Sequence, residues 1–252
     1  MSKKYCADFE TATWYDDKTY VWAFAVTEIG REDEKVIYGN CIEDFIIWCK
    51  NANNPEIYFH NEKFDGEFII YYLLSHGFKW IKDRKEKDNM TFTTLITDSG
   101  IFYSIEIFFE VKNKRVKKCK ILDSLKILNF SVEEIAKSFG LELKKLKIDY
   151  KKVREKGHEL SLEEINYIKN DVLIVSKALN VLFNEGLTKM TAASNALFEF
   201  KKIMTENKFK HYFPILEKNV DKLIRNSYKR RIYIFKPNLW RKRNWWAYCI
   251  RC

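Results

Sequence analysis

Two acidic side chains near the start of the chain are the first that could do chemistry together. Asp8 and Glu10 stand at the end of an apolar run, residues 5–9, that predicts a β-strand. Side chains two apart on a strand project from one face of a sheet, so these carboxylates would repel each other. A proton or a cation relieves that repulsion, and carboxylate oxygens suit Mg²⁺ or Mn²⁺. Alone, the pair fits a solvated strand end better, so a metal site requires further ligands.

The surrounding pattern predicts the elements that would position this pair. Alternating apolar and polar residues indicate strands, and apolar residues three and four apart indicate helices. The predicted strands are residues 5–9, 20–28, 35–38, 56–59, 91–97, 101–111 and 116–122, and the predicted helices are residues 42–49, 65–74, 131–139 and 161–186. Intermixed strands and helices predict an α/β fold.

A third carboxylate candidate follows the strand at residues 56–59. Residues 60–66 read His-Asn-Glu-Lys-Phe-Asp-Gly, and they lead into an apolar helical segment. Asp65 therefore lies near the start of a predicted helix, where an acid interacts favourably with the helix dipole. Taken alone, Asp65 is equally consistent with a helix cap and with a carboxylate that points into a cleft.

The clearest predicted helix begins at Ser161. Ser161 and Glu164 have the spacing of a capping box, as Ser131 and Glu134 have at the preceding helix. Its apolar stripe consists of Ile165, Ile168, Val172, Val175, Leu179 and Leu182, and Gly186 ends it. Tyr167 and Asp171 are four residues apart beside that stripe. They are either an edge tyrosine with a solvated acid, or a phenol and a carboxylate that face one cleft.

Composition limits the class of protein. The chain has 252 residues, of which 46% are hydrophobic, so it can bury a sizeable core in one large or two modest domains. The longest apolar run is far shorter than the roughly 18 residues of a membrane span. We expect a soluble, cytoplasmic protein that makes no membrane contact. Six scattered cysteines favour reduced thiols, and a terminal Cys-x-x-C without a second pair argues against zinc.

The formal net charge of +10 favours a nucleic-acid partner, although its distribution is uneven. Residues 230–252 hold seven of the lysines and arginines, no acid, and three of the seven tryptophans. The strongly basic run at residues 112–120 is better explained as a solvated hairpin than as a phosphate groove.

Three segments together resemble the exonuclease motifs of family B DNA polymerases, in the same order and spacing. They are Asp8-Phe9-Glu10, the segment at residues 61–66, and the segment at residues 167–171, which reads Tyr-Ile-Lys-Asn-Asp. Further segments resemble the protein-primed polymerases of small tailed phages, namely residues 122–126, Lys145 ahead of residues 148–150, and residues 190–192. The likeness covers residues 4–229, and three motifs in register are far more specific than any one of them.

This resemblance implies a fold, a reaction and residue roles. The fold would be the DnaQ-like, RNase H-like exonuclease fold, a mixed β-sheet flanked by helices. Asp8, Glu10, Asp65 and Asp171 would hold two Mg²⁺ or Mn²⁺ ions, one to activate water and one to stabilise the leaving 3′ oxygen. Tyr167 would orient the water, and Lys145 would neutralise the scissile phosphate, although Lys145 also fits a solvated lysine run.

The same resemblance implies a set of residues that hold the 3′ end of single-stranded DNA. Phe64 and Tyr150 would stack on bases, which tolerates any sequence. On chemical grounds alone, Phe64 fits a core residue equally well, and His60 fits a histidine at a strand end whose hydrogen bonds are satisfied within the protein. The acid Glu62 stands where a neutral side chain would suit DNA better. The implied single-stranded DNA-binding residues are Thr11, His60, Asn61, Phe64, Ser124, Leu125 and Tyr150.

The likeness ends after residue 229. Where the family has a Tyr-x-Gly-Gly loop, this chain has Tyr228-Lys229-Arg230-Arg231, and no palm metal motif follows. We therefore expect no DNA synthesis from this chain. The predicted domains are an exonuclease at residues 1–190, an incomplete start of a polymerase domain at 191–229, and a basic aromatic tail at 230–252. Leu197, Phe198, Phe200 and Phe213 would then lack their partner surface.

The tail is interpreted as the product of a shifted reading frame. A tryptophan codon, TGG, followed by any base gives glycine in the next frame, so the three tail tryptophans would become glycines. With A/T-rich codons, dropping one base after Lys229 restores a Tyr-Lys-Gly-Gly loop. The alternative is a genuine basic, aromatic tail that binds nucleic acid.

Two functions from different classes remain open at this point. One is a metal-dependent 3′–5′ exonuclease on single-stranded DNA, the proofreading part of a viral DNA-directed DNA polymerase. The other is a non-catalytic module that binds DNA or a replication partner such as a terminal protein. The sequence does not exclude RNA as substrate, and it predicts no oligomeric state.

Overall fold

The computed structural model describes all residues except 1, 16–17, 33–34, 114, 150–151 and 233–252. Contacts divide the chain into two compact units, Met1–Leu197 and the segment that begins at Phe198. The predicted tail beyond residue 232, with its Cys-x-x-C, lies outside the described residues. No helix in the described part of the chain is long and apolar enough to cross a membrane.

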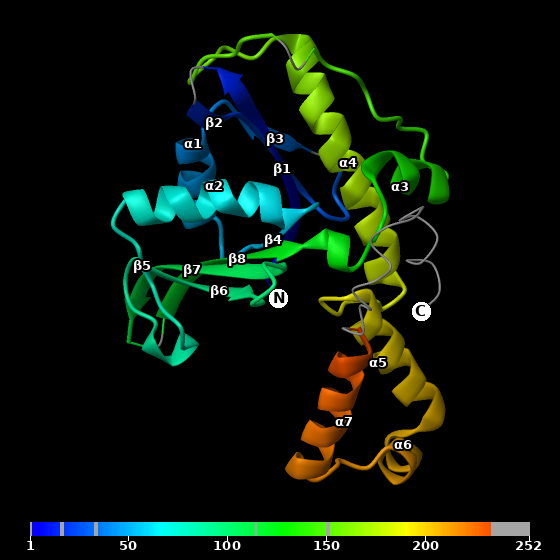
Figure 1. Ribbon diagram of the computed structural model, residues 1–252. Coiled ribbons are helices and arrows are strands. Elements are labelled where there is room, and N and C mark those ends of the chain that lie inside the picture. The colour runs from blue at the N-terminus through cyan, green and yellow to red at the C-terminus, as the bar shows by residue number, and fades with distance from the viewer. Residues whose placement is uncertain (1, 16–17, 33–34, 114, 150–151, 233–252) are drawn as a thin grey trace, which may run out of the picture. The chain divides into compact units, whose positions relative to one another are not determined.

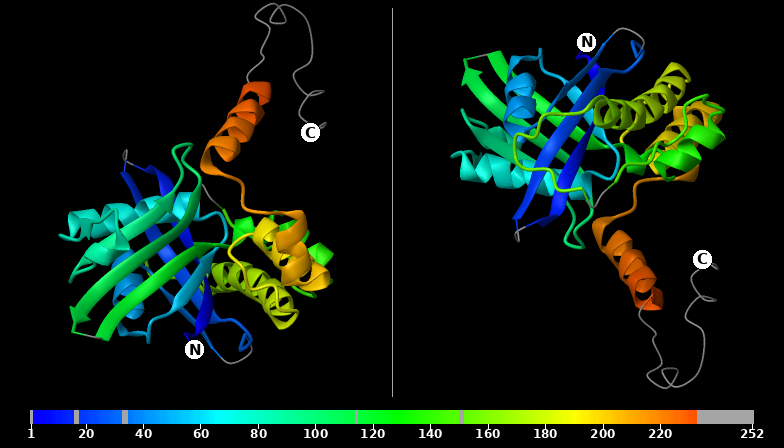
Figure 2. Two further views of the ribbon diagram at one scale, coloured as in Figure 1. Left: turned by 90° about the horizontal axis from the view of Figure 1, so that it is seen from below. Right: turned by 90° about the horizontal axis from the view of Figure 1, so that it is seen from above.

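One eight-stranded mixed sheet forms the centre of the first unit (Figure 1, Figure 2). Its spatial order is β3-β2-β1-β4-β8-β7-β6-β5. The strands are β1 (Lys4–Tyr15), β2 (Lys18–Glu28), β3 (Val36–Gly39), β4 (Glu56–Phe59), β5 (Lys79–Trp80), β6 (Thr91–Ile96), β7 (Phe102–Lys112) and β8 (Arg115–Asp123). This arrangement confirms the predicted mixed sheet, although β1 runs beyond the predicted residues 5–9 because it pairs along its length with β2.

The parallel strands bring the candidate residues to one edge of the sheet. β1 and β4 are parallel, and so are β4 and β8, so their carboxyl ends lie together. Asp8 and Glu10 in β1, the residues that follow Phe59, and the residues that follow Asp123 all belong to that edge. The register between β1 and β2 shifts between Glu10 and Thr11, an irregularity beside the carboxylate pair.

Helices cover both faces of the sheet. α1 (Ile42–Asn51) and α2 (Glu62–Ser75) pack with Phe9 of β1 in one core, and α3 (Val132–Ser138) and α4 (Leu162–Asn184) pack with Cys6 in the other. Because Cys6, Asp8 and Glu10 alternate with Ala7 and Phe9, the two acids face α4. The bounds and caps of α4 confirm the sequence prediction: Ser161 and Glu164 form a complete capping box, and Gly186 follows with φ +85°.

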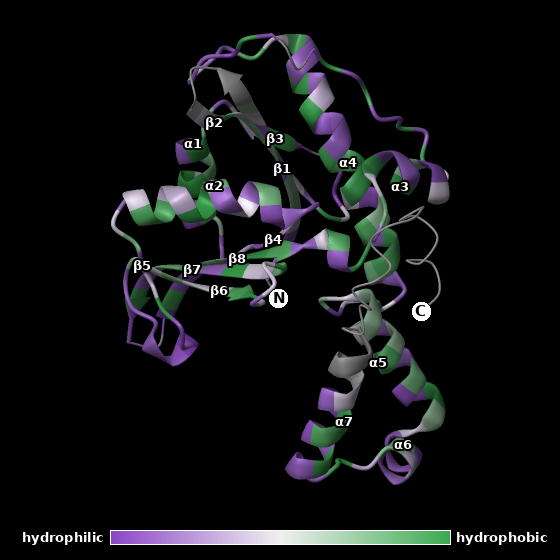
Figure 3. Cartoon of the chain, in the orientation of Figure 1, coloured by the Kyte–Doolittle hydropathy of each residue, from purple (hydrophilic) through white to green (hydrophobic). Residues whose placement is uncertain are grey.

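The second unit consists of helices with mixed surfaces. α5 (Ala192–Met204) crosses the boundary between the units, and α6 (Glu206–Tyr212) and α7 (Lys218–Ile232) follow. Phe200, Phe209 and Phe213 pack on one another, with ring centroids 5.1–6.2 Å apart. Apolar residues remain on the surface of these helices, among hydrophilic ones (Figure 3). The exposed residues include Leu197, Phe198, Phe200 and Phe213, as predicted, together with Ile203 and Ile215.

Candidate active site

Four acidic residues from three elements converge at the carboxyl edge of the sheet. Asp8 and Glu10 come from β1, Asp171 from α4, and Asp65 from the first turn of α2. A hollow of about 190 Å³ lies between β1 and α4, and Asp8, Glu10 and Asp171 line it. Asp65 is 3% exposed, and the charges of Asp8 and Glu10 act on its carboxyl. Segments that are far apart in the sequence therefore meet at one site, as the family resemblance implies.

Burial and mutual repulsion favour the neutral form of these acids. Burial and the nearby Asp171 charge raise the pKa of Asp8 to about 7. Burial, with Asp8 and Asp171, raises the pKa of Glu10 to about 9. Burial and the charges of Asp8 and Glu10 hold the pKa of Asp65 well above its usual value. Burial also raises the pKa of Asp171, although Lys145 opposes the shift. Such a cluster gains by binding positive charge.

The donor set fits a hard divalent cation in its chemistry. The oxygens are all carboxylate oxygens, which Mg²⁺ and Mn²⁺ prefer. Two of them, Asp65 Oδ1 and Asp171 Oδ1, are buried without a hydrogen-bond partner, which is unusual for polar atoms in a folded protein. Among the described residues, no group of three or more His, Cys, Asp or Glu side chains is arranged to hold an ion as it stands. Ion binding therefore requires that these carboxylates turn toward a shared point.

A phenol and an ammonium group complete the hollow. Tyr167 lies one helical turn before Asp171 on α4, is 2% exposed, and lines the hollow. Lys145 lines it from the segment between α3 and α4, with Nζ 3.8 Å from Asp171 Oδ2. The structure thus places Tyr167 and Asp171 on one cleft, which was one of the two arrangements open from the sequence.

Hydrogen bonds join the turn after β4 to the turn after β8 beside this hollow. Asn61, the N-cap of α2, has a left-handed backbone, and its N–H donates to Asp123 Oδ1 at 3.1 Å. His60 Nδ1 lies 3.0 Å from Ser124 Oγ, and His60 Nε2 donates to the carbonyl oxygen of Phe130 at 2.7 Å. Both ring nitrogens of His60 therefore have partners, as the satisfied-histidine interpretation predicts.

The remaining residues implied for single-stranded DNA differ in their surroundings. Phe64 is 46% exposed on α2, which makes the core interpretation of this residue wrong and leaves ring surface open to solvent. Thr11 and Leu125 are half-buried, and the Leu125 N–H donates to Asp123 Oδ1 at 2.9 Å. Tyr150 lies outside the described residues.

Glu62 faces inward, away from the solvent that DNA would occupy. Glu62 is fully buried, and neither of its carboxyl oxygens has a hydrogen-bond partner. Burial and the neighbouring Asp123 charge raise the pKa of Glu62 to about 9. At neutral pH this residue is therefore an uncharged acid, which explains how an acidic residue is tolerated within a candidate DNA-binding segment.

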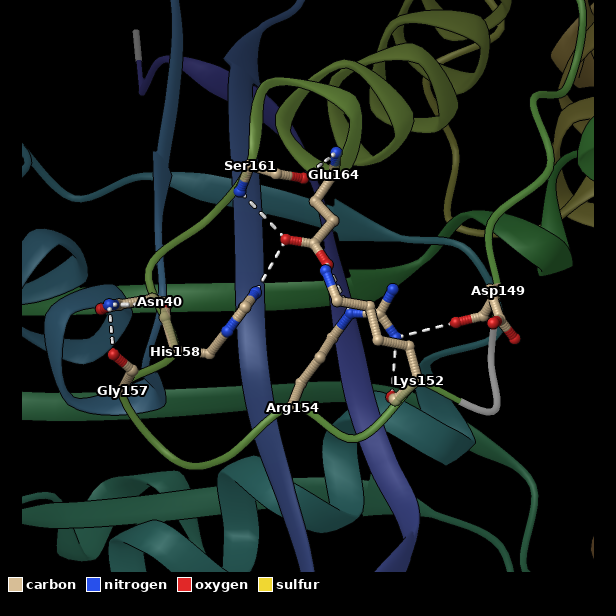
Figure 4. A network of polar contacts seen from close by, with 8 residues as sticks. All are labelled: Asn40, Asp149, Lys152, Arg154, Gly157, His158, Ser161 and Glu164. Carbon is tan, nitrogen blue, oxygen red and sulfur yellow. Dashed lines mark hydrogen bonds and ion pairs between the residues drawn. The ribbon is translucent and has the colours of Figure 1, made fainter.

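A buried ion-pair network fixes the segment that leads into α4 (Figure 4). Glu164 Oε1 accepts from Arg154 Nε at 2.7 Å, and Glu164 Oε2 accepts from His158 Nε2 at 2.8 Å. Arg154 also donates to the carbonyl oxygens of Asp149 and Lys152, and its guanidinium lies 4.5 Å from the Trp22 ring centroid. Burial alone would raise the pKa of Glu164, but these hydrogen bonds hold it well below its usual value.

Sequence reasoning did not identify Arg154, Asn170 or Phe130 as contributors to the site. The capping box marked Glu164, but no local signal distinguishes Arg154 from the many other basic residues of the chain. Phe130 contributes a backbone carbonyl, which no sequence pattern reveals. Asn170 stands inside the motif at residues 167–171, and its position next to Asp171 was the available signal.

The chain matches one protein family along most of its length. The profile of the family described as DNA polymerase type B, organellar and viral, matches residues 47–163 and 154–229. The DNA polymerase of Bacillus phage M2 is 44% identical over 230 residues, which cover 91% of this chain and 39% of that protein. The DNA polymerase of Streptococcus phage Cp-1 is 31% identical over 240 residues, which cover 89% of this chain and 39% of that protein.

Solved structures agree with these sequence matches. The phi29 DNA polymerase in complex with single-stranded DNA superposes with a TM-score of 0.84 and 40% identity, over 90% of this chain and 39% of that one. Its complex with primer-template DNA gives a TM-score of 0.83, also with 40% identity and the same coverage. The chain therefore spans about 39% of the length of these relatives.

Proposed function

Because this chain belongs to the organellar and viral type B DNA polymerases, we propose that it is a metal-dependent 3′–5′ exonuclease that acts on single-stranded DNA. The observation that carries the proposal is the convergence of Asp8, Glu10, Asp65 and Asp171 beside Tyr167 and Lys145. These four carboxylates come from three elements, their pKa values are raised, and Asp65 and Asp171 each have a buried oxygen without a hydrogen-bond partner. A shared cation would stabilise the charged form of all four.

Each of these six residues has a proposed role in phosphodiester hydrolysis. The four carboxylates would hold two Mg²⁺ or Mn²⁺ ions, which activate the attacking water and stabilise the leaving 3′ oxygen when bound. The phenol of Tyr167 holds that water in line with the phosphorus atom. Lys145 places its ammonium beside Asp171, where it offsets negative charge on the scissile phosphate.

The turns beside the hollow present the 3′ end. The exposed ring of Phe64 stacks on a base, which provides grip without sequence preference. His60 and Asn61 are held by Ser124 and Asp123, so the surface that meets the strand is fixed before DNA arrives. The phi29 polymerase complexes with single-stranded and primer-template DNA support a DNA partner for this chain. Terminal protein is a second proposed partner, by family resemblance.

The proposal is tested by digestion of single-stranded oligonucleotides, of DNA and of matched RNA sequence, that carry a label near the 5′ end. With Mg²⁺, the purified chain should shorten the DNA from its 3′ end by single nucleotides. The variant with Asp8→Ala and Glu10→Ala should lose this activity and keep the circular dichroism spectrum of the parent. A matched control replaces two exposed acids, Glu86→Ala with Asp98→Ala, and should cleave as fast as the parent.

Two results would count against an exonuclease. Equal cleavage by the parent and the Asp8 and Glu10 double variant would assign the activity to a contaminant. Tight binding of single-stranded DNA without cleavage, in Mg²⁺ and in Mn²⁺, would favour the non-catalytic module. Faster digestion of the RNA strand would identify RNA, and not DNA, as the preferred substrate.

A further inference from the structure

Lys145 stands on a segment without regular secondary structure. Between α3 and α4, the described residues form neither helix nor strand beyond Phe139, and Lys145 is exposed in two fifths of its side chain. Leu143 and Ile148, on either side of Lys145, pack against the core beneath α4. Those apolar contacts tether the segment, but they are not directional. A catalytic ammonium must be held within a fraction of an ångström, so a directional contact is required.

Asn170 supplies that contact. Its Nδ2 donates to the backbone carbonyl oxygen of Lys144 at 2.8 Å, directly before Lys145. This hydrogen bond joins the segment to α4 directly, beside the longer approach of Lys145 Nζ to Asp171 Oδ2 at 3.8 Å. Asn170 is 9% exposed and directly precedes Asp171 on α4. One turn of a rigid helix therefore carries both the carboxylate and the anchor of the segment that brings the ammonium to it.

We propose that Asn170 is a positioning residue for Lys145, which it holds beside Asp171 through the carbonyl oxygen of Lys144. The inference rests on the proposed nuclease function in so far as Lys145 acts on the phosphate. The side chain of Asn170 also contacts the carboxyl of Asp171, and this contact lowers the pKa of Asp171. The part of its contribution that acts through the Lys145 ammonium should vanish when that group is absent.

A double-mutant cycle separates positioning from a general structural role. The four proteins are the parent, Asn170→Ala, Lys145→Ala and the double variant, and the measurement is the rate of 3′ digestion of a single-stranded oligonucleotide in Mg²⁺. Asn170→Ala should lower kcat by about 10-fold to 100-fold with little change in KM, as loss of a supporting contact does. In the Lys145→Ala background, the same substitution should cost clearly less than it does in the parent, because only the contact of Asn170 with Asp171 then remains to be lost. Losses that simply multiply would overturn the proposal.

A second measurement does not depend on activity. Limited digestion with trypsin in EDTA, with the cut sites identified by mass spectrometry, should become faster after Lys144, Lys145 and Lys147 in Asn170→Ala while α4 keeps the resistance of the parent. The control Asn184→Ala replaces an exposed asparagine on the same helix, whose Nδ2 donates to Asn180 within that helix, and should change neither the trypsin digestion nor the nuclease activity.

The two measurements distinguish a failure of the positioning proposal from a failure of the proposed nuclease function. A parent chain that shows no nuclease activity would refute the proposed function, and the trypsin experiment would then decide the positioning role alone. Unchanged trypsin digestion at residues 144–147 in Asn170→Ala would overturn the proposal whether or not the chain is active.

Discussion

Arg154 Nε donates to Glu164 Oε1 at 2.7 Å, and both side chains are almost completely buried, at 4% and 3% exposure. Arg154 belongs to the irregular segment before α4, and Glu164 is the third helical residue of α4 and part of its capping box. This ion pair, with the contacts of Lys152 and His158 to the same carboxylate, joins the helix that carries Tyr167 and Asp171 to the irregular segment before it. The geometry of the candidate site depends on this pair, although neither residue lines the hollow.

Arg154→Met should destabilise the protein substantially. Removal of one partner leaves a buried carboxylate with fewer compensating charges, which costs roughly 3 kcal/mol, toward the lower end of the range for buried pairs because Lys152 and His158 still contact Glu164. The measurement is urea unfolding followed by circular dichroism. As a control, Lys156→Met breaks the exposed pair with Glu43 and should cost less than about 1 kcal/mol. Equal effects of the two substitutions would contradict the role given to the buried pair.

Tyr167→Phe should slow cleavage and leave DNA binding intact. The ring remains in its buried place, so the change removes only the hydroxyl that would orient the water. A fall in kcat of about 10-fold to 100-fold is the expected cost of lost orientation. The control is Tyr58→Phe, which removes a hydroxyl from the same core but not from the lining of the hollow. If the Tyr167→Phe variant cleaves as fast as the parent, the hydroxyl of this tyrosine has no role in cleavage and the residue is structural.

The metal-free protein should lose stability as the pH rises from about 4 to about 9. Asp8 and Glu10 have pKa values of about 7 and about 9 in the fold, above the ordinary values of 3.8 and 4.5 that they regain on unfolding. The folded state therefore binds more protons than the unfolded state within this window, and each rise in pH favours unfolding. Thermal melting in EDTA from pH 5 to pH 9 measures the effect.

A variant with neutral side chains, and the addition of Mg²⁺, distinguish the contribution of Asp8 and Glu10 to this pH dependence from that of the other titrating groups. With Asp8→Asn and Glu10→Gln, the melting temperature should fall less steeply over the same pH range. Added Mg²⁺ should raise the melting temperature of the parent more at pH 8 than at pH 5, because protons compete for the same oxygens at low pH. A Mg²⁺ effect of equal size in the neutral variant would place the ion elsewhere.

Phe64→Ala should weaken binding of single-stranded DNA by about 1 to 3 kcal/mol, the usual contribution of one base stacked on an aromatic ring. The expected signature is a raised KM with kcat nearly unchanged, measured on short oligonucleotides. Tyr71→Ala provides the control, because Tyr71 is 75% exposed on the same helix and lies outside the candidate site. If both substitutions raise KM alike, the ring of Phe64 is not a specific contact.

Local sequence signals predicted the elements of this fold well, and tertiary burial set the limit of what they could predict. Ser161 with Glu164, and β4 at Glu56–Phe59, lie where the sequence places them, because capping and alternation are decided by near neighbours. Glu62 and Arg154 could not be interpreted in the same way. Their burial depends on segments far away in the sequence, and the same letters would describe solvated charges. The convergence of Asp8, Asp65 and Asp171 was predicted through family resemblance. From spacing alone, each of these acids fitted a solvated or capping residue as well as a metal ligand.

The second unit should cause the isolated chain to associate. Large apolar side chains remain exposed on α5, α6 and the residues that follow, well beyond the scattered apolar residues of an ordinary monomer surface. Ile203 and Ile215 are 81% and 101% exposed, so charged replacements there remove apolar surface without disturbing packing. Ile203→Lys with Ile215→Lys should shift the chain toward monomer in analytical ultracentrifugation at equal melting temperature, with nuclease activity unchanged. The control, Lys82→Ala with Lys87→Ala, alters two exposed residues of the first unit and should leave association as it is. A parent chain that is already monomeric at high concentration would contradict this prediction.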